Sequence, residues 1–412
     1  MPNNWKTYKL EELTTKLGDG LHGTPKYSDN GEYYFINGNN LTNGKIEIKK
    51  DTRRVTYDEF LKHKKDLDEN TLFVSINGTI GNVGTYNGEK VILGKSACYF
   101  NIKDGVDKEF IKQIFSSKLS KDYLENNATG TTIKNVSLKT MREFPINLPP
   151  FEEQKAIASI LSTIDVKIEN NLAINKTLEE MAMALYKHWF VDFGPFQDGE
   201  FVESELGKIP KGWEVKKIGE VIETLGGGTP STTTKEYWED GDILWYSPTD
   251  LTRENSLFSF DTAKKITALG LQKSSAKMFP ANSLLMSSRA TIGLLTINTK
   301  EACTNQGFIT MLPNDKLTVY QLYFWVKDNM DLIVSKANGS TFKEISKSNF
   351  RDLEIVVPNS IESYIEQTKD NFEQIKNNTS ENQTLTQLRD TLLPKLISGE
   401  VRLKEFRESI TN

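Results

Sequence analysis

Two long segments of the chain carry apolar residues at helical spacing. The first, residues 151–190, contains neither proline nor glycine; Pro149-Pro150 precedes it and Gly194-Pro195 follows it. Because apolar positions three and four apart form one face of an α-helix, this segment is predicted to be a single long helix. A related pattern within residues 359–412 predicts a second helix followed by a tail.

Both predicted helices fit one heptad frame with mainly apolar a and d positions. Asparagine interrupts each seam, and a polar residue at such a position fixes register and partner at some cost in stability. We therefore predict that the helices pair antiparallel as a coiled coil; the alternative is that each packs only on its own domain. The seam residues are Leu161, Ile164, Ile168, Asn171, Asn175, Leu178, Ala182 and Leu185 in the first helix and Ile375, Asn378, Asn382, Leu385, Arg389 and Leu392 in the second.

The rest of the chain consists of short apolar runs bounded by Gly, Asn and Asp, a pattern typical of strands joined by turns. The predicted fold class is therefore α+β, a mixed α/β fold. Predicted strands lie at 33–36, 72–76, 97–102, 243–246, 283–286 and 307–312, and predicted helices at 108–126 and 319–335.

The chain is a tandem duplication. Residues 130–149 read GTTIKNVSLKTMREFPINLP and residues 339–358 read GSTFKEISKSNFRDLEIVVP, an ungapped match at an offset of 209 (339 − 130 = 209). Two long repeats predict two similar domains rather than a solenoid of short units. Other landmarks repeat at nearly the same offset: Trp5 with Trp213, Gly23-Thr24-Pro25 with Gly228-Thr229-Pro230, and Thr79-Ile80-Gly81 with Thr291-Ile292-Gly293.

The repeats and helices together predict the domain organisation. The two domains would be separated by the antiparallel helix pair and related by a pseudo-twofold axis. A helix of 40 residues is about 60 Å long, longer than one turn of duplex DNA at about 34 Å. The predicted boundaries are 1–150 for the first domain, 151–192 for the first helix, 193–212 for a linker, 213–358 for the second domain and 359–412 for the second helix and tail.

Length and composition limit the class of protein. The chain has 412 residues, which is long for one ordinary core and suits two domains. No apolar run approaches the roughly 18 residues of a membrane span, and the first residues lack the apolar stretch of a signal peptide. Cys98 and Cys303 imply no disulfide framework, which suits a reducing cytoplasm. We therefore expect a cytoplasmic protein without a membrane partner.

The net charge of −5 is unevenly distributed along the chain. Residues 1–150 hold 22 basic and 19 acidic side chains, and residues 213–358 hold 16 and 17, so the two domains together carry +2. The segments that follow them, 151–200 and 359–412, together carry −7. This distribution permits DNA binding by the domains, although single charge runs usually form solvated surface.

Motifs for catalysis are incomplete. The segment Asn147-Leu148-Pro149-Pro150-Phe151 approaches the Asn-Pro-Pro-Tyr/Phe motif of N6-adenine methyltransferases, but the intervening leucine displaces the amide. Residues 18–23 match GxGxxG, yet polar residues precede them and Pro25 follows, so the strand and helix that a nucleotide site needs are not predicted. No GxxxxGK[ST] loop occurs, and no His lies near a Cys at zinc-ligand spacing. We predict no catalytic, cofactor-binding or metal-binding residue in this chain.

Further segments make the chain resemble a known family over nearly its whole length. With the GTP turn near the start of each repeat, their order resembles the specificity subunit of a type I restriction-modification system. The second helix departs from the pattern, because IESYIEQ at 361–367 is a poor counterpart of EEQKAI at 152–157. The segments are LPPFEEQKAIASIL at 148–161, LYKHWFVDFGPF at 185–196, GDILWYSPTDL at 241–251, ANSLLMSSRATIG at 281–293, TNQGF at 304–308 and LRDTLLPKLISGEV at 388–401.

The resemblance implies two target-recognition domains, each of which reads one half of a bipartite site in double-stranded DNA. It also implies that the long helices space these domains and dock methylation subunits, of which two are expected, while restriction and translocation subunits join through the complex. S-adenosylmethionine, ATP and Mg²⁺ are then expected on the partner subunits. Two alternatives stay open: a DNA-modifying enzyme of a fused restriction system, and a two-headed scaffold that binds protein.

Candidate DNA contacts are polar and aromatic residues near the turns that both repeats share. Arg can bridge guanine O6 and N7, and Asn can pair with adenine N6 and N7. Lys134 and Lys343 occupy equivalent positions and are predicted to contact the DNA backbone. Each candidate could instead stabilise its own loop. The candidates are Thr24, Lys26, Tyr27, Asn37, Asn39, Asn77, Lys95, Ser96 and Lys134 in the first repeat, and Thr229, Ser231, Tyr246, Ser247, Arg253, Ser288, Arg289, Asn305 and Lys343 in the second.

Overall fold

The computed structural model describes residues 2, 4–130, 133–254, 256–339 and 343–402. The chain forms two compact units: unit 1 contains residues 1–168 and 384–412, and unit 2 contains residues 169–383. Both units combine short strands with helices, which confirms the predicted mixed α/β class. The part of the predicted tail after residue 402 lies outside the described residues.

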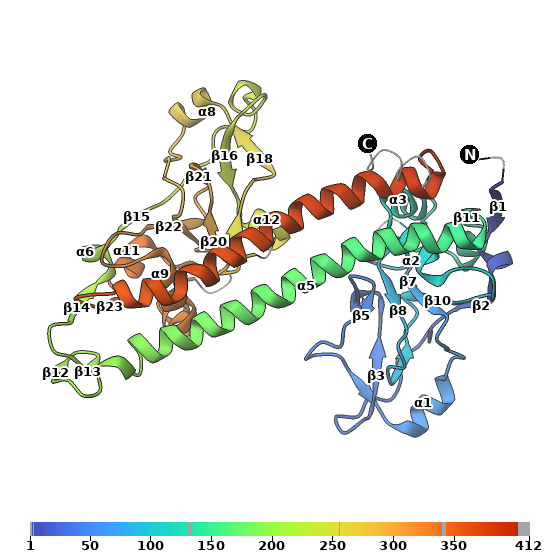
Figure 1. Ribbon diagram of the computed structural model, residues 1–412, viewed down its shortest axis with the longest axis horizontal. Coiled ribbons are helices and arrows are strands. Elements are labelled where there is room, and N and C mark those ends of the chain that lie inside the picture. Colours follow the sequence, from blue (N-terminus) through green and yellow to red (C-terminus); the bar gives the residue numbers. More distant parts are fainter. Residues whose placement is uncertain (1, 3, 131–132, 255, 340–342, 403–412) are drawn as a thin grey trace. The chain divides into compact units, whose positions relative to one another are not determined.

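Two long helices, α5 (Phe151–Phe190) and α12 (Glu362–Ser398), each contribute to both units. Helix α5, green in Figure 1, coincides with the segment 151–190 predicted from its apolar pattern and ends before residue 192, the predicted boundary of the helical segment. Helix α12 contains Pro394 in its last turns. In unit 1, the end of α12 meets the beginning of α5, where Arg389 pairs with Asp165 at 3.1 Å.

The helix pairing in unit 2 passes through the predicted asparagines. Asn171 donates a hydrogen bond to Asn382 (2.8 Å), and Asn378 donates one to Asn175 (2.8 Å). Rising residue numbers on one helix therefore meet falling numbers on the other. Within each unit the helices run antiparallel, as predicted, and they also pack on the adjacent sheet domain.

In unit 1 a four-stranded antiparallel main sheet has the order β2-β10-β7-β8. Apolar side chains of this sheet and of helix α2 form one core with Leu161 of α5 and Leu396 of α12. The bounds are β2 Thr14–Asp19, β7 Thr71–Ser75, β8 Val83–Thr85, β10 Ala97–Ile102, α2 Lys108–Ser116, α3 Lys118–Asn126 and α4 Leu138–Arg142.

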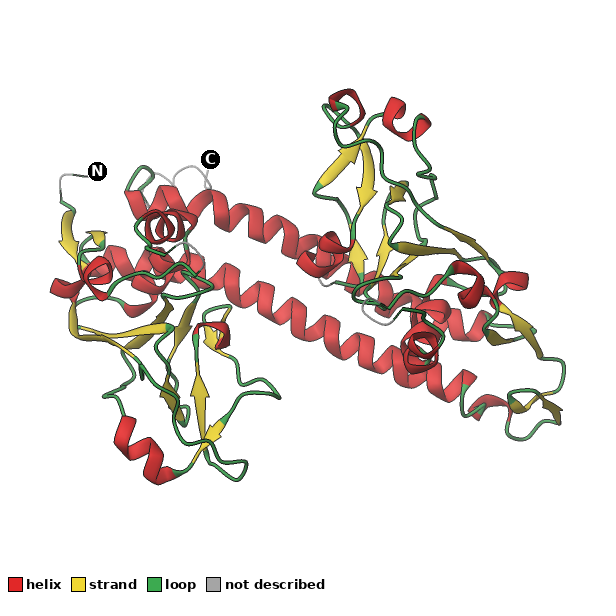
Figure 2. Ribbon diagram, turned by 180° about the vertical axis from the view of Figure 1, so that it is seen from behind, coloured by secondary structure: helices red, strands yellow, loops and turns green. Residues whose placement is uncertain are grey.

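A small sheet of unit 1 has the order β6-β3-β9, and its strands β3 and β9 run parallel. With helix α1, it lies on the side of the main sheet that faces away from α5 (Figures 1 and 2). The remaining strands form the antiparallel pairs β1·β11 and β4·β5. The bounds are β1 Lys6–Lys9, β3 Tyr33–Ile36, β4 Leu41–Thr42, β5 Lys45–Ile46, β6 Arg54–Val55, α1 Tyr57–His63, β9 Val91–Leu93 and β11 Pro145–Leu148.

Unit 2 repeats this arrangement with one additional strand. Its main sheet has the order β15-β22-β19-β20-β17 and its small sheet the order β18-β16-β21, in which β16 and β21 run parallel. The small sheet and α8 again project away from the long helices (Figures 1 and 2). The strand bounds are β12 Phe201–Ser204, β13 Gly207–Pro210, β14 Glu214–Lys217, β15 Glu223–Leu225, β16 Ile243–Tyr246, β17 Phe258–Ser259, β18 Lys264–Ile266, β19 Leu284–Ser287, β20 Leu295–Asn298, β21 Ala302–Thr304, β22 Phe308–Leu312 and β23 Glu354–Val357.

The predicted helices that follow the main sheet are wrong in the same way in both units. The predicted helices at 108–126 and 319–335 are each two helices, α2 with α3 in unit 1 and α9 with α10 in unit 2. The first breaks at Ser117, whose backbone is extended and whose hydroxyl accepts a hydrogen bond from the Ser120 N–H. Serine is a favoured N-cap, so this residue starts a new helix. The bounds are α6 Ile218–Val221, α7 Pro248–Glu254, α8 Ala268–Gln272, α9 Val319–Asp328, α10 Met330–Ser335 and α11 Lys347–Arg351.

Candidate nucleic-acid interface

In unit 1, backbone hydrogen bonds bring four chain segments together where the small sheet meets the main sheet. The Val136 N–H donates to the Ile76 carbonyl (2.8 Å), and the Ile76 N–H donates to the Ser96 carbonyl (2.9 Å). The Gly94 N–H donates to the Ile36 carbonyl at the end of β3 (2.8 Å). We call this assembly the loop junction of unit 1; it comprises residues 36–38, 76–78, 94–96 and 134–136.

Unit 2 forms its loop junction with the corresponding bonds. The Ile345 N–H donates to the Ser288 carbonyl (3.0 Å), and the Ser288 N–H donates to the Gly307 carbonyl (2.8 Å). The Asn305 N–H donates to the Tyr246 carbonyl (2.9 Å). The bonded positions therefore match those of unit 1 at offsets from 209 (345 − 136) to 212 (288 − 76). The loop junction of unit 2 comprises residues 246–248, 288–290, 305–307 and 343–345.

A tight turn beside each junction has the same backbone conformation in both units. Gly78 has φ +76°, and its counterpart Ala290 has φ 60°, a region that strains a residue with a Cβ atom. The hydroxyls of Ser75 and Ser287 each accept a hydrogen bond from the N–H seven residues further on (2.8 and 2.9 Å). Each hydroxyl also donates to the carbonyl four residues on, so the turn is closed by its own polar groups.

The side chains at equivalent junction positions differ between the units. Asn77 of unit 1 corresponds to Arg289 of unit 2, and both are partly exposed. An amide both donates and accepts hydrogen bonds, whereas a guanidinium only donates. Lys134 and Lys343 are alike and exposed. One backbone frame thus presents two different sets of donors and acceptors. Further differing pairs include Asn37 with Ser247, Lys95 with Gln306, Ser96 with Gly307 and Asn135 with Glu344.

Hydrogen bonds within the junction orient several of these side chains. In unit 1, Asn37 Oδ1 accepts from the Ser96 hydroxyl (2.9 Å), and that hydroxyl accepts from the Gly38 N–H (2.8 Å). Asn77 Nδ2 donates to Asn135 Oδ1 at 3.3 Å. The polar groups are therefore positioned before any ligand arrives, which lowers the ordering cost of binding.

The predicted DNA contacts divide into those inside and those outside the junctions. Inside lie Asn37, Asn77, Lys95, Ser96, Lys134, Tyr246, Ser247, Ser288, Arg289, Asn305 and Lys343. Outside, Thr24, Lys26, Tyr27, Thr229 and Ser231 lie on the loops that lead to the small sheets, Asn39 is in the turn after β3, and Arg253 is on α7, 3.8 Å from Asp250. Among these, Thr229 contacts a junction residue, because its hydroxyl donates to Gln306 Oε1 (2.7 Å).

Two of the predicted contacts inside the junctions, Tyr246 and Ser288, have buried side chains, and three junction residues were not among the candidates. Tyr246 is 0% exposed and belongs to a hydrophobic cluster, and Ser288 is 3% exposed. Their side chains are therefore not available at the surface of the chain. The missed residues are Asn135, Gln306 and Glu344. The offset of the repeat could have found Gln306, since it pairs this residue with the candidate Lys95. Asn135 and Glu344 each directly follow a candidate lysine, Lys134 or Lys343.

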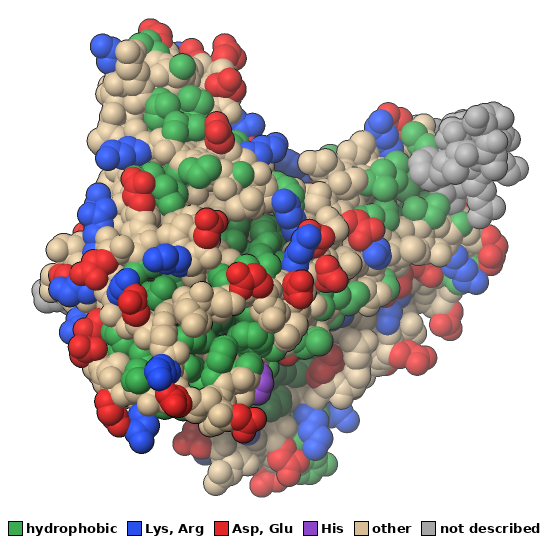
Figure 3. Space-filling view, turned by 60° about the vertical axis from the view of Figure 1, so that its left-hand side comes forward, with side chains coloured by type: hydrophobic (Ala, Val, Ile, Leu, Met, Phe, Trp, Pro, Cys, Tyr) green, Lys and Arg blue, Asp and Glu red, His purple; other side chains and the backbone are tan. Residues whose placement is uncertain are grey.

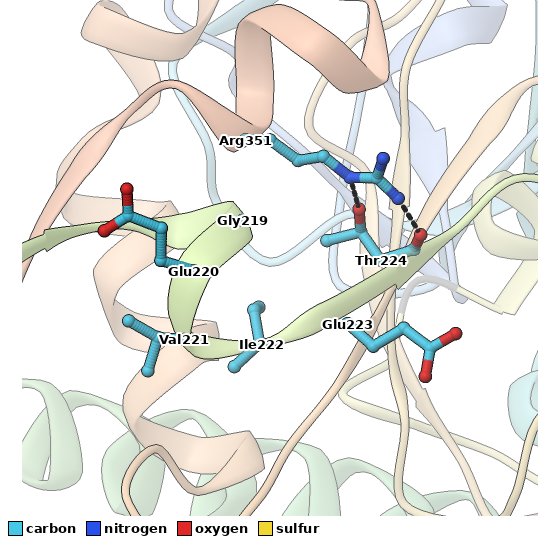
Figure 4. A pocket seen from close by; sticks show the side chains of 7 residues that line it. All are labelled: Gly219, Glu220, Val221, Ile222, Glu223, Thr224 and Arg351. Carbon is cyan, nitrogen blue, oxygen red and sulfur yellow. Dashed lines mark hydrogen bonds between the residues drawn. The ribbon is translucent and has the colours of Figure 1, made fainter.

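A shallow pocket in unit 2 is lined by residues of α6, β15 and α11 (Figure 4). Arg351 crosses it and donates from Nε to the Thr224 hydroxyl (2.6 Å) and from Nη2 to the Thr224 carbonyl (2.5 Å). Glu220 and Glu223 also line the pocket. The Arg351 guanidinium already donates to Thr224, and the two carboxylates would repel an anion. We therefore regard the pocket as a packing contact between α11 and β15 rather than as a ligand site.

The glycines of the 18–23 segment serve backbone packing. Strand β2 ends at Asp19, and the next regular element is β3 rather than a helix, so the arrangement that holds a nucleotide is not built. A Cβ atom at Gly20 would lie 2.2 Å from the Leu93 carbonyl oxygen. Its counterpart Gly227 lies as close to the Thr304 carbonyl (2.1 Å). Glycine at both places lets the loop approach the small sheet.

Neither a strongly charged patch nor a group of possible metal ligands accompanies the junctions in the described part of the chain. Figure 3 shows Lys and Arg side chains interspersed with Asp and Glu over the face in view, not gathered in one field. No group of three or more His, Cys, Asp or Glu side chains that could hold a metal occurs among the described residues.

Burial raises the pKa of both thiols, that of Cys303 to about 12. Within the described part of the chain, every helix is too short or too polar to cross a membrane.

Comparison with known proteins identifies relatives along almost the whole chain. Residues 2–180 and 210–389 match the family model described as the type I restriction modification DNA specificity domain. The type I restriction enzyme MjaIX specificity subunit of Methanocaldococcus jannaschii is 28% identical, over 98% of this chain and 95% of that protein. The HindI specificity subunit of Haemophilus influenzae is 28% identical, over 71% of this chain and 77% of that protein. The crystal structure of the type I restriction-modification system S subunit from M. genitalium has a TM-score of 0.57 at 19% identity, covering 96% of this chain and 97% of that one, so the two share a fold.

Proposed function

Because the chain belongs to the family of type I restriction modification DNA specificity domains, which its two repeats match in turn, we propose that each unit reads one half of a bipartite site in double-stranded DNA. The family makes the chain a specificity subunit of a type I restriction-modification system. The two half-sites, the role of the helices and the partner subunits are the finer parts of the proposal.

The observation that supports this most directly is the pair of loop junctions. Both are held by the same backbone bonds, yet one carries Asn77 where the other carries Arg289. Asn matches the N6 and N7 edge of adenine, and Arg matches O6 and N7 of guanine. Lys134 and Lys343 do not differ and suit a phosphate contact, which positions a protein on DNA without reading sequence. Two unequal half-sites are therefore expected.

We assign the long helices to spacing and docking. Their asparagine contacts fix the register between α5 and α12 in unit 2, and a fixed register is what a spacer needs. Ile174 and Met181 of α5 are 46% and 56% exposed and lie off the predicted seam. Such apolar side chains suit helices of methylation subunits, of which we propose two per complex. Restriction and translocation subunits would join through that complex.

The chain itself is proposed to be non-catalytic and cytoplasmic. Adenine methylation would be performed by the methylation subunits with S-adenosylmethionine, and translocation and cleavage by the restriction subunits with ATP and Mg²⁺. The incomplete methyltransferase motif at 147–151 supports this division, because Asn147 lies in β11 and accepts a hydrogen bond from the Thr7 hydroxyl (2.8 Å). Its amide therefore serves the β1·β11 pair.

The experiment that tests the proposal is long-read mapping of N6-methyladenine in the source strain, with and without this gene. In the parent strain we expect one bipartite motif that is methylated on both half-sites. Deletion of the gene should abolish methylation of that motif alone, and a plasmid copy should restore it. Unchanged methylation after deletion would overturn the assignment. Methylation of DNA by the purified chain without partners would favour a fused enzyme, and a complex with no affinity for duplex DNA would favour a protein scaffold.

A further inference from the structure

Each unit places a cation over an exposed or half-buried aromatic ring beside its small sheet. In unit 1, the Arg53 guanidinium carbon lies 5.8 Å from the centre of the Tyr27 ring. In unit 2, Lys264 Nζ lies 5.7 Å from the centre of the Trp238 ring. Both distances lie within the range of a cation–π interaction, which reaches to about 6 Å. Neither pair belongs to a loop junction.

The two pairs occupy the same position in the repeat. Tyr27 and Trp238 are 211 residues apart (238 − 27), and so are Arg53 and Lys264 (264 − 53). Each cation immediately precedes or begins the outer strand of its small sheet, β6 or β18. The Phe35 N–H donates to the Arg53 carbonyl (2.9 Å), while Trp245 is the strand partner of Lys264. The sheet therefore fixes both cations in the same way.

In each pair, the aromatic ring that contacts the cation also packs against a second aromatic ring. Tyr27 packs against Phe35 with ring centres 6.0 Å apart, and Trp238 packs edge-on against Trp245 at 5.0 Å. All three residue types differ between the units, but the order of cation, outer ring and inner ring is retained. Significant cation–π contacts occur roughly once per 70–80 residues, so two at one equivalent place call for a common cause. We call each set of three residues a cation–aromatic stack.

The cations of the stacks are exposed and have no acidic partner in the part of the chain that the structure describes. Among the described residues, no carboxylate lies within 4.0 Å of Arg53 or Lys264, and neither is buried. Neighbouring cations differ in this respect: Lys90 pairs with Glu32 (3.3 Å) and Lys265 with Asp261 (3.1 Å). Lys90 also lies 5.8 Å from the centre of the Tyr33 ring, so a cation that contacts a ring can still pair with a carboxylate. The lack of such a partner at Arg53 and Lys264 therefore does not follow from their ring contacts. The positive charge of each stack is thus available to an external anion.

We propose that the two cation–aromatic stacks grip the sugar–phosphate backbone of DNA beside each half-site. The cation would pair with a phosphate, and the outer ring, 44% exposed in Tyr27, would pack against the adjoining deoxyribose. The inference rests on the proposed function, because it assigns the stacks to the same duplex that the junctions read. It adds a second contact in each unit that carries affinity and no sequence preference.

Duplex DNA fits the stacks better than an acidic protein segment does. A protein partner would have to present the same acidic feature to both units, although their rings and cations differ. A DNA backbone presents phosphates to both units without regard to sequence, one for about every 1.7 Å of helix axis. For such a ligand, either Arg or Lys can supply the positive charge, and either Tyr or Trp can supply the aromatic ring. The differences between the two stacks are therefore expected.

The test uses the full chain in complex with its methylation subunits. The probe is a 60-base-pair duplex that carries the methylated motif of the source strain, and a duplex of equal length without the motif measures non-specific binding. The variant is Arg53→Gln with Lys264→Gln. The matched control is Lys90→Gln with Lys265→Gln, which removes neighbouring cations that already have carboxylate partners. Affinity is measured between 0.05 and 0.4 M salt, and unfolding temperature confirms that each variant is folded.

We expect the variant to lose affinity for both duplexes by the same factor, roughly 5- to 10-fold per cation at 0.1 M salt, and the slope of log K against log salt to fall by about 0.9 per cation. The control should keep both quantities. A variant with unchanged affinity and slope, or one that changes only complex assembly in light scattering, overturns the stack assignment while the half-site proposal stands. A parent complex that does not prefer the motif overturns both.

Discussion

Asn77 and Arg289 occupy one place on one backbone frame but offer different hydrogen bonds. The frame is enforced by the turn that follows, where even Ala290 adopts the left-handed conformation of Gly78. Strain of this kind persists where surrounding bonds hold it and is often found at functional sites. The identity of the preceding side chain can therefore change without moving the backbone, and a change of base preference can follow from one substitution.

Arg289→Gln is expected to relax or shift base preference at one position of one half-site. A bidentate Arg–guanine pair contributes about 1–3 kcal/mol of discrimination, so methylation of the original motif should fall while sites with a substituted base gain methylation. Methylome sequencing of a strain carrying the variant measures this. Asn77→Ala serves as the reciprocal control, since it should affect only the other half-site. Simultaneous changes in both half-sites would contradict independent reading by the two units.

Lys134→Ala and Lys343→Ala are expected to weaken binding to all sequences alike. Each should lower the slope of log K against log salt by about 0.9, because one phosphate contact is lost. Titrations with motif-bearing and motif-free duplexes supply both slopes. Lys118→Ala is the control, since Lys118 pairs with Asp122 on α3 at 2.7 Å. A change in the preferred base would show that the lysine reads sequence.

Both thiols are expected to resist alkylation in the folded chain. Burial raises the pKa of Cys98 and raises that of Cys303 to about 12. Iodoacetamide reacts with the thiolate, and little thiolate forms when the pH lies well below the pKa of the thiol. Iodoacetamide at pH 8 should therefore modify neither residue. Mass spectrometry before and after unfolding in urea measures the difference. Rapid labelling of the native chain would show that either thiol is more open than its environment implies.

At the residue scale, the sequence predicted which residues lie in the loop junctions better than it predicted which of their side chains are exposed. Lys134, Lys343, Asn77 and Arg289 could be found because they flank landmarks shared by both repeats. The burial of Tyr246 could not be predicted, because an aromatic residue beside a turn can lie either in a core or at the surface. Its place depends on strand β21 lying parallel beside β16, a contact between distant segments.

At the element scale, three of the six predicted strands have the observed bounds, and so does the helix at 151–190. The other strands are displaced by one residue at one or both ends. These elements were predictable because their apolar runs are bounded by turn residues. The breaks at Ser117 and Asn329 were missed, since a polar residue inside a helical pattern does not reveal whether the helix ends there. The Ser117 side chain caps the new helix, whereas the Asn329 side chain makes no cap hydrogen bond.

Asn378→Leu is expected to destabilise the helix pairing of unit 2. Asn378 is 4% exposed, donates to Asn175 (2.8 Å) and accepts from Gln374 (2.7 Å), so its loss leaves buried polar groups without these partners. A cost of about 1–3 kcal/mol is expected, measured as a fall in unfolding temperature.

The double substitution Asn175→Leu with Asn378→Leu should recover much of that loss, because it removes both sides of one contact. Asn377→Leu, on the exposed face of the same helix, should change stability by less than about 0.5 kcal/mol. A double variant as unstable as Asn378→Leu would show that the asparagine pair is not the source of the effect.

At the scale of the whole molecule, duplication explains why one chain carries two unequal copies of one loop junction. The loop junctions and the cation–aromatic stacks keep their backbone arrangement, while their side chains differ between the units. Acidic residues outside the two sheet domains offset their small positive charge, so the chain carries −5 in total. Under the proposed function, affinity for DNA would come from individual side-chain contacts and from the proposed partner subunits rather than from a broad positive field.

The proposed spacer predicts that shortening both long helices by one heptad shortens the DNA spacer. Deleting residues 166–172 together with residues 382–388 removes matched segments and retains the contacts Asp165–Arg389 and Asn175–Asn378. Seven residues span about 10 Å of helix, which corresponds to about three base pairs at roughly 3.4 Å each. Selection from a duplex library with variable spacers should recover both original half-sites at the shorter distance. The control, Leu172→Gln with Leu388→Gln, alters the same segments without shortening them and should keep the original spacer. A deletion variant that also selects the original spacer would show that the helices do not set it.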